Sequence, residues 1–188
     1  IDHMAHIACD DIDLESTTTA GVFAGLGLED VAQLAFEERW LLRAGDLRFP
    51  RPACILGRGG FGVVASALLH GQAVAVKILP GGAHNERRLR ALLNELRVLR
   101  RVRHPNVVLF FGSVVEPNAG SIALVYEQIR GMQLDLVLRT ANPSPLRRFR
   151  MIYDVSSALR YLHAQVPAIV HSDVKDGNVL VEESKFML

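Results

Sequence analysis

The chain has 188 residues, 49% of them hydrophobic, which is enough to bury the core of one domain and excludes disorder throughout. Its formal net charge of +1 conceals an asymmetry. Residues 1–50 carry ten acidic and three basic side chains, whereas residues 51–188 carry ten acidic and eighteen basic ones. The basic residues are spread over several predicted elements without interleaved aromatic residues, so nucleic-acid binding is only a weak alternative.

The remaining bulk features indicate an intracellular, cytoplasmic chain without a membrane span. Cys9 and Cys54 are too far apart to resemble a disulfide framework, and no signal-peptide pattern is present. The apolar run Val63–Leu79 includes His70 and Lys77, so two buried strands explain it better than a transmembrane helix. A metal site built on His3, His6 and Cys9 would lack a fourth ligand nearby.

The first part of the chain is predicted to be a separate, partly flexible segment. Residues 1–27 combine aspartates, a Ser/Thr run and glycines, a composition typical of a tail or linker. Apolar residues then recur at helical spacing and predict a short helix over 28–43. We therefore divide the chain into an acidic N-terminal segment, 1–48, and a domain, 49–188.

Three consecutive antiparallel strands are predicted next. Cys54–Leu56 leads into a glycine cluster, Val63–Leu69 follows, and the alternating stretch Ala73–Leu79 comes third. The dipeptide His70–Gly71 between the last two runs predicts a tight hairpin turn.

A helix and two more strands complete the predicted sheet layer. Leucines recur at helical spacing from Leu89 to Leu99, and strand-like runs follow at Val107–Phe111 and Ile122–Tyr126. Later residues predict helices, most clearly at Leu146–Ala164, and then an apolar run at Val179–Val181. The order of elements predicts an α+β fold, with a five-stranded antiparallel layer before a helical part.

Residues 57–64 fit the pattern G-x-G-x-x-G-x-V, in which missing side chains let backbone N–H groups approach phosphate oxygens. A dinucleotide-binding fold needs a helix directly after the glycines, but here a second strand follows. The context favours a glycine-rich hairpin over a nucleotide. The pattern alone is weak, and an ordinary glycine hairpin is the structural alternative.

Lys77 closes an apolar strand and therefore needs a partner. Glu95 has only apolar residues at three and four positions along its predicted helix, so no arginine pairs with it locally. An unpaired buried charge costs about 3–5 kcal/mol. We therefore predict that Lys77 pairs with Glu95 beside nucleotide phosphates; the alternative is that Lys77 extends to solvent.

Residues 171–178 supply a third group of polar side chains. Asp173 can accept a hydroxyl proton, Lys175 can neutralise a transferring phosphoryl group, and Asn178 can hold a metal ion through its amide oxygen. A short stretch with these residues is usually just a turn. Its position after the glycine pattern, Lys77 and Glu95 favours a catalytic loop.

These motifs, in this order, resemble those of eukaryotic-type protein kinases over roughly residues 40–188. Residues 103–112 and Trp40 resemble the tyrosine-kinase-like group, which includes Raf-like and mixed-lineage kinases. Lys175 resembles the serine/threonine class. The resemblance implies an N-lobe at about 49–126 with helix C, a hinge at 127–131 and a partial C-lobe at 132–188.

The resemblance also implies phosphoryl transfer from ATP, with Mg²⁺ or Mn²⁺, to Ser/Thr hydroxyls of a protein substrate. The implied catalytic residues are Lys77, Glu95, Asp173, Lys175 and Asn178, of which Asn178 is the metal ligand. The implied nucleotide contacts are Leu56, Gly57, Gly59, Gly60, Phe61, Gly62, Val64, Ala75, Lys77, Tyr126, Glu127, Ile129 and Leu180. In this resemblance Tyr126 is the gatekeeper, and the backbone of Glu127 to Ile129 pairs with adenine.

Two departures from the family pattern change the expectations. Ser172 replaces the arginine that usually pairs with an activation-loop phosphate, so we expect activity that does not depend on that phosphate. No Asp-Phe-Gly follows Asn178 within the sequence, so a principal magnesium ligand is missing and these 188 residues alone are expected to be inactive. The alternatives are a pseudokinase scaffold and a truncated regulatory isoform that binds nucleotide or partners without catalysis.

Overall fold

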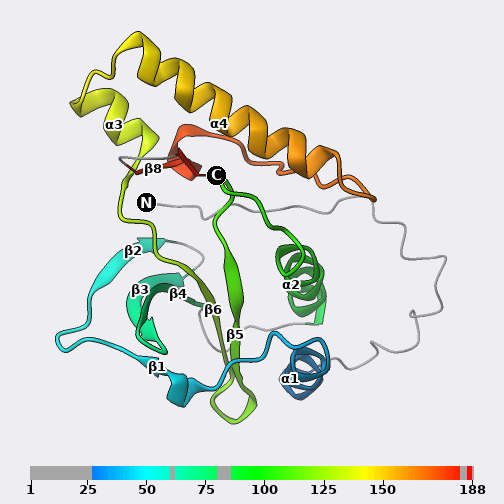
Figure 1. The fold of residues 1–188 in the computed structure, drawn as a ribbon. Coiled ribbons are helices and arrows are strands. Elements are labelled where there is room, and N and C mark those ends of the chain that lie inside the picture. Colours follow the sequence, from blue (N-terminus) through cyan, green and yellow to red (C-terminus); the bar gives the residue numbers. More distant parts are fainter. Residues whose placement is uncertain (1–26, 60–61, 80–85, 183–185, 188) are drawn as a thin grey trace.

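A computed structural model describes residues 27–59, 62–79, 86–182 and 186–187. The metal-site alternative at residues 3–9 lies outside this part of the chain. An antiparallel sheet occupies the lower half of Figure 1, and helices α3 (Leu134–Thr140) and α4 (Pro145–His163) lie above it. The predicted α+β class is confirmed. No helix among the described residues is long and apolar enough to cross a membrane.

The main sheet is a curled antiparallel layer. Its strands are β1 (Leu47–Arg48), β2 (Ile55–Gly59), β3 (Gly62–Leu69), β4 (Gln72–Ile78), β5 (Phe110–Glu116) and β6 (Ser121–Glu127). They are arranged in the order β1-β3-β4-β6-β5, and β2 also pairs with β3. The predicted turn at His70–Gly71 is confirmed, because both residues adopt the positive φ angles, 50° and 90°, that a tight hairpin turn requires. The short strand β1 was not predicted.

The fourth predicted strand, Val107–Phe111, was wrong in its bounds. The chain instead turns after His104, where the backbone N–H groups of Asn106 and Val107 donate to the His104 Nδ1 and carbonyl oxygen. Strand β5 therefore begins at Phe110 and runs to Glu116. A side-chain acceptor fixes this turn, and the apolar pattern of the segment did not reveal it.

Helix α2 (Glu86–Leu99) covers one face of the sheet, as the leucine spacing predicted. Its buried residues Leu89, Leu93 and Leu96 share one core cluster with Leu124 and Tyr126 of β6. Residues at alternate positions face the other side of the sheet, where a smaller cluster forms; its buried members are Ala67, Val74, Val76 and Val125. The helix is thus fixed against the strands that carry the candidate site.

Helix α1 (Leu28–Glu37) ends earlier than the predicted 28–43. Arg39 adopts a left-handed conformation with φ of 61°, which an α-helix does not continue through. The next residues are extended and bind the edge of β5, because Ser113 donates to the Trp40 carbonyl and Leu42 donates to that of Ser113. A short 3₁₀ turn, η2 (Ala44–Asp46), then leads into β1.

The helical part begins after β6. Strand β7 (Met132–Gln133) leads into α3, and α4 follows with Ser144 as its N-cap, whose hydroxyl accepts from the Arg147 N–H at 3.3 Å. The helix predicted at 146–164 is therefore confirmed. The remaining elements are η3 (Pro117–Ala119), η4 (Asp176–Asn178), β8 (Leu180–Val181) and β9 (Phe186–Met187). Strands β7, β8 and β9 form a second small sheet.

Candidate active site

One face of the main sheet carries several of the predicted nucleotide contacts. Val64 on β3 pairs with Lys77 on β4, and Ala75 lies two residues from Lys77 on the same face. Burial lowers the pKa of Lys77, and the Glu95 carboxylate opposes this shift. The two charges are therefore close enough to interact, although their ion pair stays a prediction.

Glu95 reaches the sheet from α2 and also acts on Tyr126. Tyr126 is only 5% exposed, and its pKa is raised first by burial and then by the nearby carboxylate. Its ring lies 5.4 Å from the Phe110 ring, between centroids, at an interplanar angle of 60°. Tyr126 is thus part of the core beneath α2, and it is paired across the strands with Ala75.

The glycine-rich pattern forms a hairpin, with Leu56, Gly57 and Gly59 on β2 and Gly62 at the start of β3. Gly60 and Phe61 lie outside the described residues. Gly62 has φ of 121°, and a Cβ there would meet the backbone carbonyl of Ile78 on β4. A glycine is required at this position by strand packing alone, whatever phosphate contacts the hairpin makes.

The segment after β6 is the predicted hinge. Glu127 is held to the lead-in of β5, because its N–H donates to the Leu109 carbonyl at 2.9 Å. Within the described residues, neither backbone polar group of Ile129 has a hydrogen-bond partner. Leu180 lies on β8 opposite Gln133, which follows this segment. The chain therefore brings Leu180 next to the exit of the predicted hinge.

The loop at 171–178 brings its three predicted catalytic side chains together on one carboxylate oxygen. Oδ2 of Asp173 lies 3.0 Å from Lys175 Nζ and accepts from Asn178 Nδ2 at 2.9 Å. Asn178 also donates to the Asp173 carbonyl at 2.6 Å. Because the turn η4 holds Asn178 opposite Asp173, the loop has a fixed shape rather than an extended one.

The loop is anchored to the residues that follow the hinge. Gln133 Nε2 donates to the Gly177 carbonyl at 2.9 Å, and the Leu134 N–H donates to the Val179 carbonyl at 2.8 Å. His171 at the start of the loop is buried, and burial lowers its pKa while Asp173 opposes the shift. Ser172, between them, is exposed and has φ of 58°.

Asn178 fits the role of a metal ligand. Its Oδ1 is buried, and the described residues provide no hydrogen bond to it, because its Nδ2 makes both contacts with Asp173. An orphaned amide oxygen of this kind suits a hard cation such as Mg²⁺. No group of three or more His, Cys, Asp or Glu side chains among the described residues could hold a metal ion by itself.

The site also contains a side-chain contact that sequence reasoning missed. Ser66 Oγ on β3 donates to Gln128 Oε1 in the predicted hinge at 2.8 Å. Both residues lie two positions beyond predicted nucleotide contacts, Val64 and Tyr126, and alternate strand residues share a face. The spacing of two residues indicated that each side chain shares a face with a nucleotide contact. It did not indicate that the two side chains meet, because that depends on the pairing of strands that are remote in sequence.

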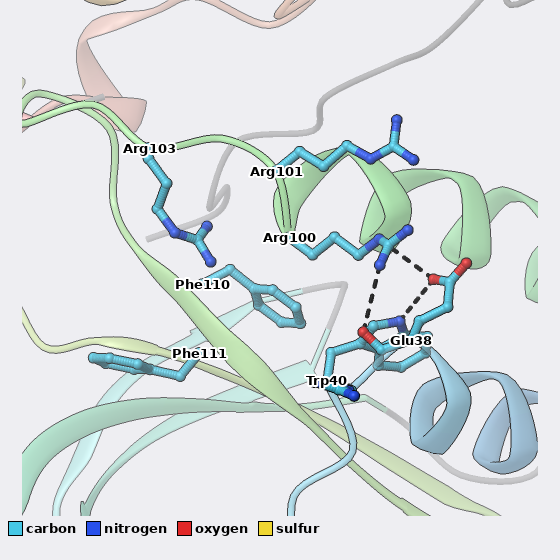
Figure 2. Close-up of a pocket in the computed structure, with 8 residues that line it drawn as sticks. Glu38, Trp40, Arg100, Arg101, Arg103, Phe110 and Phe111 are labelled. Carbon is cyan, nitrogen blue, oxygen red and sulfur yellow. Dashed lines mark hydrogen bonds and ion pairs between the residues drawn. The ribbon is translucent and has the colours of Figure 1, made fainter.

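A pocket of about 190 Å³ lies away from these residues, at the end of α2 (Figure 2). It is lined by Glu38, Arg39, Trp40, Arg100, Arg101, Arg103, Phe110 and Phe111. None of the predicted catalytic or nucleotide-binding residues lines it. The dashed lines in Figure 2 mark a hydrogen bond from Trp40 to Glu38 and the contacts of Glu38 with Arg100. Glu38 therefore connects the N-terminal segment to the end of α2.

Comparisons with known proteins agree with the arrangement of these elements. A family profile described as the protein kinase domain matches residues 52–188. Serine/threonine-protein kinase CTR1 of Arabidopsis thaliana is 40% identical over 131 residues, which cover 68% of this chain. The probable serine/threonine-protein kinases SIS8 of Arabidopsis thaliana and drkD of Dictyostelium discoideum are 36% and 35% identical, each over 69% of this chain. The chain spans only 16%, 12% and 10% of these three relatives.

Proposed function

Because this chain belongs to the protein kinase family, we propose that its protein transfers the terminal phosphoryl group of ATP to serine or threonine hydroxyls of other proteins. The observation that carries this proposal is the convergence of Lys175 and Asn178 on one carboxylate oxygen of Asp173. The serine/threonine class is supported by Lys175, two residues after Asp173, and by the names of the relatives.

We assign adenine to the space between the residues 49–126 and 132–188, beside the linking segment 127–131. Val64 and Ala75 would contact one side of the ring and Leu180 the other. The backbone groups of Ile129, which have no hydrogen-bond partner in the part of the chain that the structure describes, support this assignment, because adenine offers both a donor and an acceptor along one edge.

Phosphates belong beside Lys77 and Asn178. Burial disfavours the ammonium form of Lys77, and the negative charge of phosphates would favour it again, together with Glu95. Asn178 Oδ1 is the ligand that these residues offer to Mg²⁺. When bound, Mg²⁺ would neutralise charge on the phosphate oxygens.

Asp173 would act on the substrate hydroxyl. The hydroxyl oxygen forms a bond to the terminal phosphorus, the bond from that phosphorus to the ADP oxygen breaks, and the hydroxyl proton passes to the Asp173 carboxylate. Asn178 holds Asp173 in place through two hydrogen bonds, one to its carboxylate and one to its backbone carbonyl. Lys175, 3.0 Å from the same carboxylate, is placed to balance the negative charge of the moving phosphoryl group.

The test uses the full-length protein with ATP, Mg²⁺ and a generic protein substrate. We expect Asp173→Asn to lower kcat by about 10²- to 10⁴-fold, the usual contribution of a general base, without loss of nucleotide binding. Lys77→Met should abolish binding of ATP measured by titration calorimetry. Without nucleotide it should also lower the free energy of unfolding, because it leaves the Glu95 carboxylate, which interacts with Lys77, without its compensating charge.

Asp176→Asn is the matched control, because Asp176 is an exposed carboxylate in the same loop, and its Oδ1 accepts from the neighbouring Gly177 N–H at 2.9 Å rather than from a predicted catalytic residue. Its kcat should stay within about threefold of the wild-type value. The proposal is wrong if the full-length protein neither binds ATP nor phosphorylates protein. It is also wrong if Asp173→Asn and Asp176→Asn have the same small effect.

A further inference from the structure

The contact between Ser66 and Gln128 joins a strand to the predicted hinge. The two residues are 62 positions apart, and both are half-buried. The Ser66 hydroxyl donates to the Gln128 amide oxygen at 2.8 Å, the usual length for a good hydrogen bond from a hydroxyl. This contact links β3 to the residue directly after β6, although β4 lies between those two strands.

The strand register shows which face Ser66 occupies. Ser66 pairs with Ala75, and Ala75 pairs with Tyr126, so these three residues form one row across β3, β4 and β6. Val64 lies two residues before Ser66 and therefore shares its face. Ser66 thus lies on the same face as Val64 and Ala75, the two side chains assigned above to one side of the adenine ring.

Glu127, the residue before Gln128, is bound to a different part of the sheet, the lead-in of β5. Glu127 donates its N–H to the Leu109 carbonyl at 2.9 Å, and Glu127 Oε1 accepts from the Leu109 N–H at 3.2 Å. One hinge residue is therefore bound to the lead-in of β5, and the next is bound to β3. The backbone at the start of segment 127–131 is fixed between two parts of the sheet.

We propose that Ser66 and Gln128 are positioning residues for the adenine base, an inference that rests on the function proposed above. Their hydrogen bond fixes the distance between β3 and the hinge, and with it the height of the space available to a flat ring. Contacts to a ring weaken steeply when such a gap widens by a fraction of an ångström. The bond does not touch Asp173, so it acts on nucleotide affinity and not on phosphoryl transfer.

The experiment measures the Kd for Mg·ADP by calorimetry, and KM for ATP and kcat, in the full-length protein. Ser66→Ala and Gln128→Leu should each raise Kd and KM about fivefold, the range of one net hydrogen bond, and leave kcat unchanged. Ser66→Thr keeps the hydroxyl donor and Gln128→Glu keeps the oxygen acceptor, so each of these variants should retain the wild-type affinity. Combining Ser66→Ala with Gln128→Leu should add nothing to either change alone.

Ser121→Ala is the matched control, because Ser121 also donates to a side chain, Glu116 Oε2 at 3.4 Å, but in the hairpin between β5 and β6. It should leave Kd unchanged. An unchanged Kd in Ser66→Ala, with or without a lower thermal midpoint, overturns the positioning role. If Lys77→Met still abolishes binding in that case, the proposed function stands and only this inference fails; if the wild-type protein binds no nucleotide, both fail.

Discussion

Helix α2 carries charged side chains on two opposite faces, and the two faces differ in how far their charged partners are buried. Glu95 and Arg97 are two residues apart, so their side chains point in directions about 200° apart around the helix. Glu95 faces Lys77, whose pKa is lowered by burial. Arg97 faces Glu38 of the N-terminal segment, at 3.5 Å, where the two side chains keep 32% and 18% of their exposure.

The difference shows which charges serve stability. A desolvated cation such as Lys77 opposes folding unless something compensates it, which is typical of functional sites. Partly exposed ion pairs such as those of Glu38 contribute at most about 1 kcal/mol each. The attachment of residues 28–42 to α2 must therefore depend on apolar packing, and Trp40, which is 3% exposed, is its largest buried side chain.

Replacing Trp40 should have the largest effect on stability. Trp40→Ala removes an aromatic side chain from the core cluster shared with α2 and should lower the free energy of unfolding by about 3–5 kcal/mol. Urea denaturation monitored by circular dichroism measures this loss. Phe36→Ala, in α1, is the control, because Phe36 is 70% exposed and its replacement should change stability by less than about 0.5 kcal/mol. Equal losses in the two variants would show that Trp40 does not attach the segment.

His171 should make the stability of the protein depend on pH. Like Lys77, it is a buried ionisable group of the candidate active site. Its ring is 3% exposed, and neither ring nitrogen has a hydrogen-bond partner among the described residues. Burial lowers its pKa from the ordinary value of 6.5. The unfolded chain therefore takes up a proton at a higher pH than the folded one, so stability falls as the pH drops below 6.5.

Measurement of the free energy of unfolding from neutral pH to about pH 5 tests this prediction. His171→Gln should flatten the acid loss of stability relative to the wild-type protein. His70→Gln is the control, because His70 lies in the exposed hairpin turn, and this variant should keep the wild-type slope. A slope that is unchanged in His171→Gln would assign the acid sensitivity to other groups.

The sequence predicted what depends on neighbouring residues. The turn at His70–Gly71 and the N-terminal boundary of α4 follow from local backbone preferences, and α2 follows from leucine spacing. Asp173, Lys175 and Asn178 lie within one short loop, so their meeting needed no knowledge of the fold.

What depends on remote partners was not predictable in this way. The helix expected over 28–43 ends early because Trp40 and Leu42 bind Ser113, more than seventy positions later, and no local pattern announces that pairing. The contact of Ser66 with Gln128 required the register of three strands. The roles of the site residues themselves stay predictions, because geometry alone does not show a reaction.

Neutralising Glu38 should have the smallest effect. Its carboxylate accepts from Trp40 Nε1 at 2.9 Å and lies 3.4 Å from Arg100 Nε (Figure 2). It also lies 3.5 Å from Arg97 Nε. Because the charged side chains of Glu38, Arg97 and Arg100 keep 18%, 32% and 25% of their exposure, Glu38→Gln should lower the free energy of unfolding by less than about 1 kcal/mol. Glu37→Gln is the control, since Glu37 is exposed and its Oε1 accepts from Gln33, at 2.8 Å, along α1.

Salt distinguishes the charge of Glu38 from its hydrogen bond. Added salt screens exposed charges, so the difference between wild type and Glu38→Gln should shrink in about 1 M NaCl. The glutamine keeps an amide oxygen that can still accept from Trp40 Nε1, so this hydrogen bond is common to both proteins and the salt-sensitive difference reports the charge of Glu38. A loss above about 2 kcal/mol that ignores salt would mean that Glu38 behaves as a buried charge, as Lys77 does. The two faces of α2 would then not differ.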